Sequence, residues 1–347
     1  MPKDRKFKEP LVSIVTTAYK NERFNQKYFD SVNNQSYPNI EVIFVDSLSP
    51  DNTVVDAQKR IKRGQVVVSP TNAGCAAGNN LGVLNATGKY IFLLGPDTWT
   101  DPKCVELLVK AAEKDDEQIY TARQMTYDGK EFISCGIAAD IFGYPARTYS
   151  RDGKKRLKKI FYADGTSVFM KRENYIKIGM MDEVTFLFAE DVDLSWKAHL
   201  MGMSVIPVFD SVIYHFSGGS VGIGGYPNSK EKYVTNSNRR FLAERNIIRN
   251  ILKNYSIWNV WWILLYYFCI NIVEAVALVL TGQASSAYNS YFRAYVWNIK
   301  NIKSTFSKRK QIQQIRTVGD IEVMKNMYFL PHKILAFLEL GVPKVTK

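Results

Sequence analysis

Residues 11–53 read LVSIVTTAYKNERFNQKYFDSVNNQSYPNIEVIFVDSLSPDNT, and this stretch decides the fold. Its two β-branched, apolar runs, residues 11–17 and 40–45, predict two buried strands. Between them, residues 25–35 have the pattern of a helix, which ends at the turn Ser-Tyr-Pro-Asn. A strand, a helix and a second strand form a βαβ unit, whose two strands pair in parallel.

The same alternation continues along the chain for two more helices and two more strands: a helix over 53–62, a strand over 65–69, a helix over 78–86 and a strand over 90–94. We therefore predict an α/β protein with a Rossmann-like, mostly parallel central sheet and helices on both faces. Ligands of such sheets bind beyond the carboxyl ends of the strands. Residues 17–21, 46–51 and 95–97 follow strand ends and are the predicted binding edge.

The composition is that of a globular protein, because 46% of the 347 residues are apolar and 23% are charged. The net charge of +13 is uneven: residues 1–220 hold 28 Lys/Arg and 27 Asp/Glu, whereas residues 221–347 hold 18 and 6. This basic C-terminal third implies an anionic partner, either nucleic acid or a membrane surface. The four cysteines are widely spaced, so neither a zinc site nor a disulfide framework is expected. The charged N-terminus is not expected to be a signal peptide.

Residues 257–280 form the most hydrophobic stretch, in which only Asn259, Asn271 and Glu274 are not apolar. A helix of this length would be about 36 Å long, enough to cross a bilayer core of about 30 Å. Tryptophan and tyrosine crowd its first half, as in an interfacial aromatic belt. Three arrangements are open: a membrane crossing, a re-entrant or interfacial helix, and a helix buried in a homo-oligomer interface formed by the C-terminal helices.

Two features oppose a single crossing. The segment after residue 280 has 11 Lys/Arg and three acids, and a crossing would put it outside if the N-terminal part is cytosolic. Glu274 at bilayer depth would cost roughly 2.5–3.5 kcal/mol. We therefore predict a re-entrant or interfacial helix beside a basic helix over 291–316, on anionic headgroups at the cytoplasmic face of the cell membrane. This apolar segment also argues against a nucleic-acid partner.

Four groups of residues are candidates for chemistry. Asp46 and Asp51 follow a strand and can accept hydrogen bonds from a nucleobase or ribose, or simply cap the next helix. Asp97 ends the Gly95-Pro96-Asp97 turn, where a carboxylate can hold Mg²⁺ or Mn²⁺ or cap a helix.

The other two groups lie further along the chain. Glu190 and Asp191 adjoin an apolar run; they suit a helix N-terminus, and burial could raise the pKa of one of them and make it a base. His215 closes a strand and is either structural or a metal ligand.

Taken together, these pieces resemble the family 2 glycosyltransferases, which have the GT-A fold, and within them a bacterial and archaeal rhamnosyltransferase-like branch. The resemblance runs from about residue 11 to 220, and more weakly through RNIIRNILKNYS (245–256) to KRKQIQQIR (308–316). The matching segments are VSIVTTAYKNE (12–22), VIFVDSLSPDNT (42–53), NAGCAAGNNLGVLNATGKYIFLLGPDTWTDP (72–102), GTSVFMKRENYIKIGMMDE (165–183) and FAEDVDLSWKAHLMGMSVIPVFDSVIYHFSGGS (188–220).

The resemblance implies a role for each candidate. Asp191 would be the catalytic base, with Glu190 as its partner in the family's ED motif. Asp97 would hold the metal, completed by His215, although glycine replaces the first acid of the family's DxD element. The donor-binding residues would be Thr17, Tyr19, Asn21, Asp46, Asp51, Asn79, Asn80, Gly95, Pro96 and Asp97.

The implied activity is inverting, metal-dependent transfer of a sugar from a dTDP- or UDP-sugar to a hydroxyl of a glycan or lipid-linked acceptor, as in polysaccharide biosynthesis of the cell envelope. The predicted domains are a GT-A domain over 1–225, with nucleotide-sugar binding at 11–102 and the acceptor part at 118–225, and a basic helical region over 226–347. A catalytically inert sugar-nucleotide or polysaccharide-binding module is the alternative. A nucleotidyltransferase or dehydrogenase would need glycines after the first strand, and Thr16–Asn21 has none.

Overall fold

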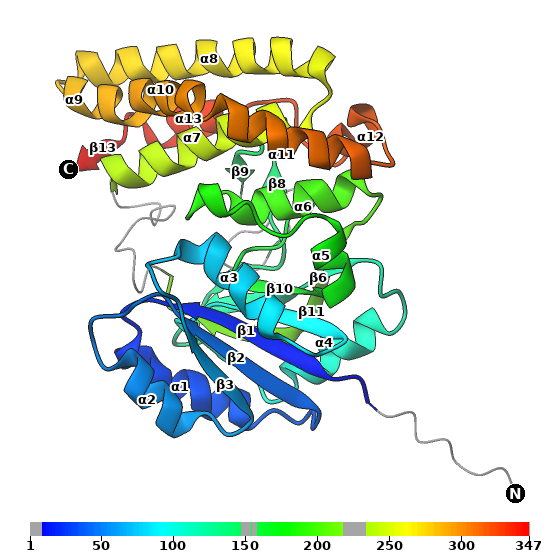
Figure 1. The fold of residues 1–347 in the computed structure, drawn as a ribbon. Helices are drawn as coiled ribbons and strands as arrows, with labels where there is room; N and C mark the ends of the chain where they lie inside the picture. The colour runs from blue at the N-terminus through cyan, green and yellow to red at the C-terminus, as the bar shows by residue number, and fades with distance from the viewer. Residues whose placement is uncertain (1–8, 147–153, 155–157, 218–233, 347) are drawn as a thin grey trace, which may run out of the picture.

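The computed structural model describes residues 9–146, 154, 158–217 and 234–346. Its central sheet has the strand order β3-β2-β1-β4-β10-β6-β11-β5, with β7 paired to β6 (Figure 1). The strands are β1 (Val12–Ala18), β2 (Ile40–Asp46), β3 (Gly64–Val68), β4 (Tyr90–Leu94), β5 (Thr98–Thr100), β6 (Ile119–Thr126), β7 (Phe132–Ser134), β10 (Ser167–Lys171) and β11 (Val205–His215).

The strand pairing confirms the predicted α/β class, and it changes from parallel to mixed across the sheet. The first four strands in the order, β3, β2, β1 and β4, pair in parallel. Strand β10 then runs antiparallel to both β4 and β6, β11 is parallel to β6, and β5 is antiparallel to β11. The parallel pairing predicted from the sequence therefore holds for the N-terminal half, and the sheet as a whole is mixed.

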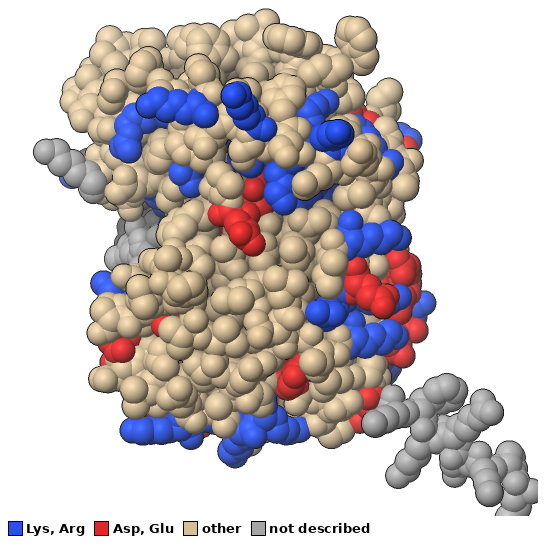
Figure 2. Space-filling model, viewed as in Figure 1, with Lys and Arg blue, Asp and Glu red and all other residues tan. Residues whose placement is uncertain are grey.

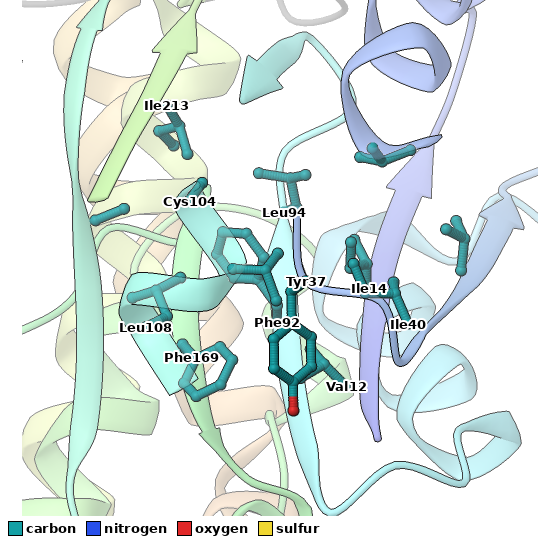
Figure 3. Packing of buried hydrophobic residues seen from close by; sticks show 14 of the residues in the cluster. Val12, Ile14, Tyr37, Ile40, Phe92, Leu94, Cys104, Leu108, Phe169 and Ile213 are labelled. Atoms are coloured by element: carbon teal, nitrogen blue, oxygen red, sulfur yellow. The ribbon is translucent and has the colours of Figure 1, made fainter. Parts of the chain in front are cut away.

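Helices cover both faces of the sheet, as the sequence predicted. On one face, Val12, Ile14 and Phe92 pack with side chains of α1 (Glu22–Asn33) and α4 (Cys104–Ala112) (Figure 3). On the other, Val15 and Leu93 pack against the helices α3 (Gly74–Asn85), α5 (Arg172–Lys177) and α6 (Glu190–Leu200). Neighbouring residues of a strand point to opposite faces, so both faces need apolar side chains. Helix α2 (Thr53–Arg60) packs beside α1.

The C-terminal helices form a second layer beyond α6 (Figure 1). Its core joins Ile247 and Ile251 to Tyr267 and to Trp196 of α6. Short strands accompany it: β8 (Ala138–Ala139) with β9 (Pro145–Ala146), and β12 (Val234–Asn236) with β13 (Lys344–Thr346). The helices are α7 (Ser237–Asn254), α8 (Ile257–Leu280), α9 (Ala284–Ala287), a π-turn (Tyr288–Phe292), α10 (Arg293–Lys300), α11 (Ile302–Ile315), α12 (Asp320–Met324) and α13 (His332–Leu340).

One predicted element differs from the structure in detail. The basic helix expected over 291–316 is interrupted, because Asn301 ends α10 and begins α11. Strand β11 has an irregularity between Val208 and Val212. The predicted domain boundary at 225 falls outside the described residues.

Glu274, which the sequence placed at bilayer depth if α8 crossed a membrane, is buried inside the helical layer. It pairs with Arg240 of α7 and lies 3.0 Å from Nζ of Lys333 of α13. Lys333 also donates to Glu244 of α7 at 2.7 Å. One face of α8 is therefore joined to the protein by buried charges, which are costly to separate once desolvated.

Candidate active site at the carboxyl edge of the sheet

The end of β2 carries a carboxylate with an unused acceptor. Asp46 is buried, and its Oδ2 accepts a hydrogen bond from the Ser49 backbone N–H at 2.9 Å. Its other oxygen, Oδ1, is buried and has no hydrogen-bond partner among the residues that the structure describes. A buried acceptor without a donor is costly. Asp46 Oδ1 is therefore suited to a ligand that brings an N–H or O–H group.

The turn after β4 brings Asp97 beside His215. Strand β5 pairs antiparallel with β11, which places Thr98 opposite His215. Asp97 Oδ1 consequently lies 3.2 Å from His215 Nε2. Burial alone would lower the pKa of His215, but the hydrogen bond to Asp97 and the negative charges of Asp97 and Asp164 together raise it. A carboxylate oxygen and an imidazole nitrogen thus converge at this edge, although they are 118 positions apart in the chain.

The local packing explains the glycine at position 95. Its N–H donates to the Thr166 carbonyl at 3.1 Å, and an added Cβ would lie only 2.9 Å from Thr166 Cγ2. A larger side chain would need Thr166 to shift. Among the described residues, no three His, Cys, Asp or Glu side chains gather as a metal site. Two protein ligands still suit Mg²⁺, which often takes one or two protein groups together with phosphate oxygens.

Helix α6 begins with the second pair of acids. Asp191 Oδ2 accepts from the Gly165 N–H at 3.1 Å, and Oδ1 accepts from the Val192 N–H at 2.8 Å. Burial raises the pKa of Asp191, and the charge of Glu190 raises it further. A carboxylate with a raised pKa binds a proton more readily, which is what a general base near neutral pH requires.

Glu190 is buried behind this base. Within the described part of the chain its Oε2 has no hydrogen-bond partner, and burial raises the pKa of its carboxyl to about 7. The thiol of Cys75, in the first turn of α3, lies beside it, and burial together with the charge of Glu190 raises the pKa of that thiol. The pair therefore sits where one of the two carboxyls is readily neutral at pH 7.

Residues 164–166, which the sequence analysis did not assign to the site, connect its two halves. The carbonyl of Thr166 accepts from Gly95, and the N–H of Gly165 donates to Asp191. They precede β10, whose antiparallel pairing with β4 puts its start beside the end of β4. A turn sequence, Asp-Gly-Thr before a strand, was the available signal, but only the pairing reveals its position.

The remaining predicted donor residues divide into two groups. Thr17 donates to Asn79 Oδ1 at 3.0 Å, and Asn21 donates to the Pro96 carbonyl at 3.0 Å, so these four surround the strand ends. Tyr19 lies in the same loop and is half-buried.

The other two residues make contacts within the protein. Asn80 uses its amide on the Met181 backbone, Glu183 and Tyr175. Asp51 is exposed and accepts from the backbone N–H and hydroxyl of Thr53, the first residue of α2.

The architecture identifies the class of protein first. Two solved structures share the mixed sheet and its helices. GalNAc-T7 with UDP, GalNAc and Mn²⁺ matches with a TM-score of 0.58 at 14% identity, covering 86% of this chain and 58% of that one. The mannosyltransferase PcManGT of Pyrobaculum calidifontis, with GDP-Man and Mn²⁺, matches with a TM-score of 0.53 at 15% identity, covering 92% and 86%. The protein has the GT-A fold.

The sequence comparison then supports a family. Residues 13–179 match the sequence model of glycosyl transferase family 2. An uncharacterized glycosyltransferase of Haemophilus influenzae is 39% identical over 94 residues, which are 25% of this chain and 36% of that protein. The chain is therefore similar to glycosyl transferase family 2 over residues 13–179. The chain spans 34–60% of the length of three further curated relatives.

Proposed function

We propose that the protein is an inverting glycosyltransferase that moves a sugar from a nucleotide-diphosphate donor to a hydroxyl of a glycan or lipid-linked glycan. The observation that carries this proposal is the arrangement around residues 164–166, where Asp191 lies on one side and the Asp97–His215 pair on the other. One side offers a base for the acceptor and the other a site for the diphosphate. The rhamnosyltransferase-like branch remains a prediction from the sequence.

The donor's nucleotide would lie along the ends of β1 and β2. Asp46 Oδ1 offers a buried acceptor for a base N–H or ribose O–H, and Thr17 and Asn79 lie beside it at the end of β1. The GDP-Man in one of the two solved structures, and the UDP and GalNAc in the other, support a nucleotide sugar as ligand. A dTDP- or UDP-sugar is our proposal for this chain.

Asp97 and His215 would hold Mg²⁺ or Mn²⁺, which when bound neutralises charge on the diphosphate. Asp191 accepts the proton of the acceptor hydroxyl. The acceptor oxygen forms a bond to the anomeric carbon from the face opposite the diphosphate, and the bond from that carbon to the diphosphate oxygen breaks. Its electron pair leaves with the nucleoside diphosphate, and the anomeric configuration is inverted.

The donor side of this proposal is tested by the metal dependence of nucleoside-diphosphate release. With a panel of UDP-, dTDP- and GDP-sugars and an envelope extract as acceptor, we expect release that needs Mn²⁺ or Mg²⁺. Asp97→Ala is expected to lower this rate by about 100-fold, because it removes a charged group from the diphosphate site.

The matched control is Asp30→Ala, which removes an exposed carboxylate of α1 and should change nothing. Equal rates in Asp97→Ala and wild type would contradict the role of Asp97. Tight donor binding without any release would instead favour the alternative function, an inert sugar-nucleotide-binding module.

We further propose that α8 lies in the membrane interface at the cytoplasmic face. Val260, Ile263, Tyr267 and Glu274 face the protein, whereas the opposite face is exposed. Side-chain exposure there reaches 82% for Trp258, 71% for Trp261 and 81% for Leu280. Tryptophan is favourable at the boundary between an apolar and a hydrated region, because its ring is apolar and its N–H is polar. This face of α8 therefore suits the headgroup region of a membrane.

The charge around α8 supports the same partner. Figure 2 shows a surface without charged side chains over α8 at the top of the view, with a row of Lys and Arg side chains just below it over α10 and α11. Four exposed basic residues lie on α10 and α11: Arg293, Lys300, Lys303 and Lys310. Each such residue near an anionic leaflet contributes about 1 kcal/mol to binding. The apolar face and this basic row together fit an anionic bilayer surface.

Vesicle binding tests the orientation of α8. The double variant Trp258→Glu, Trp261→Glu is expected to weaken co-sedimentation with vesicles of phosphatidylcholine and phosphatidylglycerol at least about tenfold, because two apolar anchors become charged. The control Val55→Glu, Leu84→Glu changes two exposed apolar residues of α2 and α3 and should bind as wild type does. A different outcome would establish an oligomer interface instead: the wild type is a dimer that does not bind vesicles, and the Trp variant is a monomer.

A further inference from the structure

The turn that leads into α6 has an unusual backbone. Phe186, Phe188 and Ala189 have φ angles of 62°, 69° and 61°. Side chains with a Cβ atom rarely adopt this left-handed region, and each such residue costs about 1–3 kcal/mol. The residues that immediately follow are Glu190 and Asp191. Contacts from elsewhere must therefore hold the turn that aims both acids.

Helix α7 supplies these contacts through two asparagine side chains. Asn246 Nδ2 lies 2.9 Å from the Thr185 carbonyl, 3.0 Å from that of Leu187 and 2.7 Å from that of Phe188. Asn250 Nδ2 donates to the Ala189 carbonyl at 3.0 Å. Both side chains are buried, at 0% and 1% exposure, so no water competes for these bonds. Residues four apart lie on one face of a helix, so Asn246 and Asn250 both face the turn at residues 186–189.

The same face of α7 also holds the first turn of α6. Nζ of Lys253 lies 3.0 Å from Asp193 Oδ2, and Asn254 Nδ2 donates to Asp193 Oδ1 at 2.9 Å. Carbonyls before Asp191 and a carboxylate after it are thus tied to one helix. The family model ends at residue 179, so all of these α7 residues lie beyond it.

We propose that Asn246 and Asn250 are positioning residues, which set the direction of Asp191 and Glu190 by holding the left-handed turn at 186–189. They contact the backbone of that turn, and they act on the reaction only through the two acids. This proposal rests on the proposed role of Asp191. Its physical basis is that a base must be placed within hydrogen-bond reach of the proton it removes, and a displacement of about 1 Å can cost 100-fold in rate.

The test compares Asn246→Leu, which keeps the size of the side chain and removes its N–H donors, with Asn238→Ala on an exposed position of the same helix. Amide hydrogen exchange of residues 185–193 is expected to rise at least about tenfold in Asn246→Leu and to stay unchanged in Asn238→Ala. This readout needs no donor sugar. In transfer assays we expect kcat to fall about 100-fold, with the KM for donor within about threefold of wild type, since the Asp46 end of the site is untouched.

The outcomes separate this proposal from the function on which it rests. If exchange rises in Asn246→Leu but the wild type shows no measurable transfer, the result supports the positioning role of Asn246 and Asn250 and counts against the glycosyltransferase proposal. Unchanged exchange, or an unchanged kcat in a folded Asn246→Leu protein, would overturn this positioning role. If Asn246→Leu does not fold, Asn250→Ala removes a single bond to the turn, and the same exchange and kcat criteria apply to it.

Discussion

Replacement of Asp191 by asparagine is expected to lower the transfer rate by 10²- to 10⁴-fold, about the contribution of a general base. The reason is that the amide cannot take the proton of the acceptor hydroxyl. Donor affinity should be retained, because Asp46 ends β2 and Asp97 follows β4, whereas Asp191 lies in the first turn of α6. The measurement is single-turnover transfer together with calorimetric titration of the donor. Retained turnover would refute Asp191 as the base.

The pH dependence provides a second readout of the same change. Burial raises the pKa of Asp191, and it raises the pKa of Glu190 to about 7. The base is active only when deprotonated, so the wild-type kcat should fall as the pH drops through the raised pKa of Asp191, and Asp191→Asn should lose this limb. A flat profile in the wild type would contradict the assignment.

The raised pKa values also affect the stability of the folded protein. A measurement of stability therefore shows whether Asp191→Asn is inactive because it lacks the base or because it unfolds. The folded state binds these protons more tightly than the unfolded chain, so the favourable contribution is present at low pH and is lost as the pH rises through the folded pKa. Asparagine carries no charge to bury. At pH 8 the unfolding midpoint of Asp191→Asn should therefore be at or above that of the wild type.

Replacement of Lys253 by methionine is expected to lower the free energy of unfolding by about 3–5 kcal/mol. Nζ of Lys253 lies 2.6 Å from Asp182 Oδ2 and 3.0 Å from Asp193 Oδ2, and all three side chains are at most 2% exposed. Burial alone would raise the pKa of Asp182, but Lys253 and Arg249 together lower it. Without Lys253, two buried carboxylates lose the cation that they share. This loss costs far more free energy than the loss of a cation from an exposed ion pair.

Urea unfolding at neutral pH measures this loss. The matched control is Lys325→Met, which breaks an exposed pair with Glu322, whose side chains are 64% and 58% exposed. It should change the free energy by less than about 1 kcal/mol. Similar losses for both variants would mean that the buried network does not contribute as its geometry implies.

The sequence alone determined the elements of this protein and the edge at which they present polar groups. Alternating apolar runs located β1, β2, β4 and α8 within a residue or two, because strand and helix periodicity are local properties. The position of Asp46 at a strand end followed from the same pattern, and so did the chemical character of the Glu190–Asp191 pair.

Only the tertiary structure decided which of these groups meet. Asp97 and His215 lie together because β5 pairs antiparallel with β11, and glycine at position 95 follows from the close approach of Thr166. Glu274 proved to be part of a buried ion network that no local pattern contains. The support of Asp191 by Asn246 joins residues more than fifty positions apart. Such contacts depend on how elements pack, and periodicity along the chain carries no information about distances between elements.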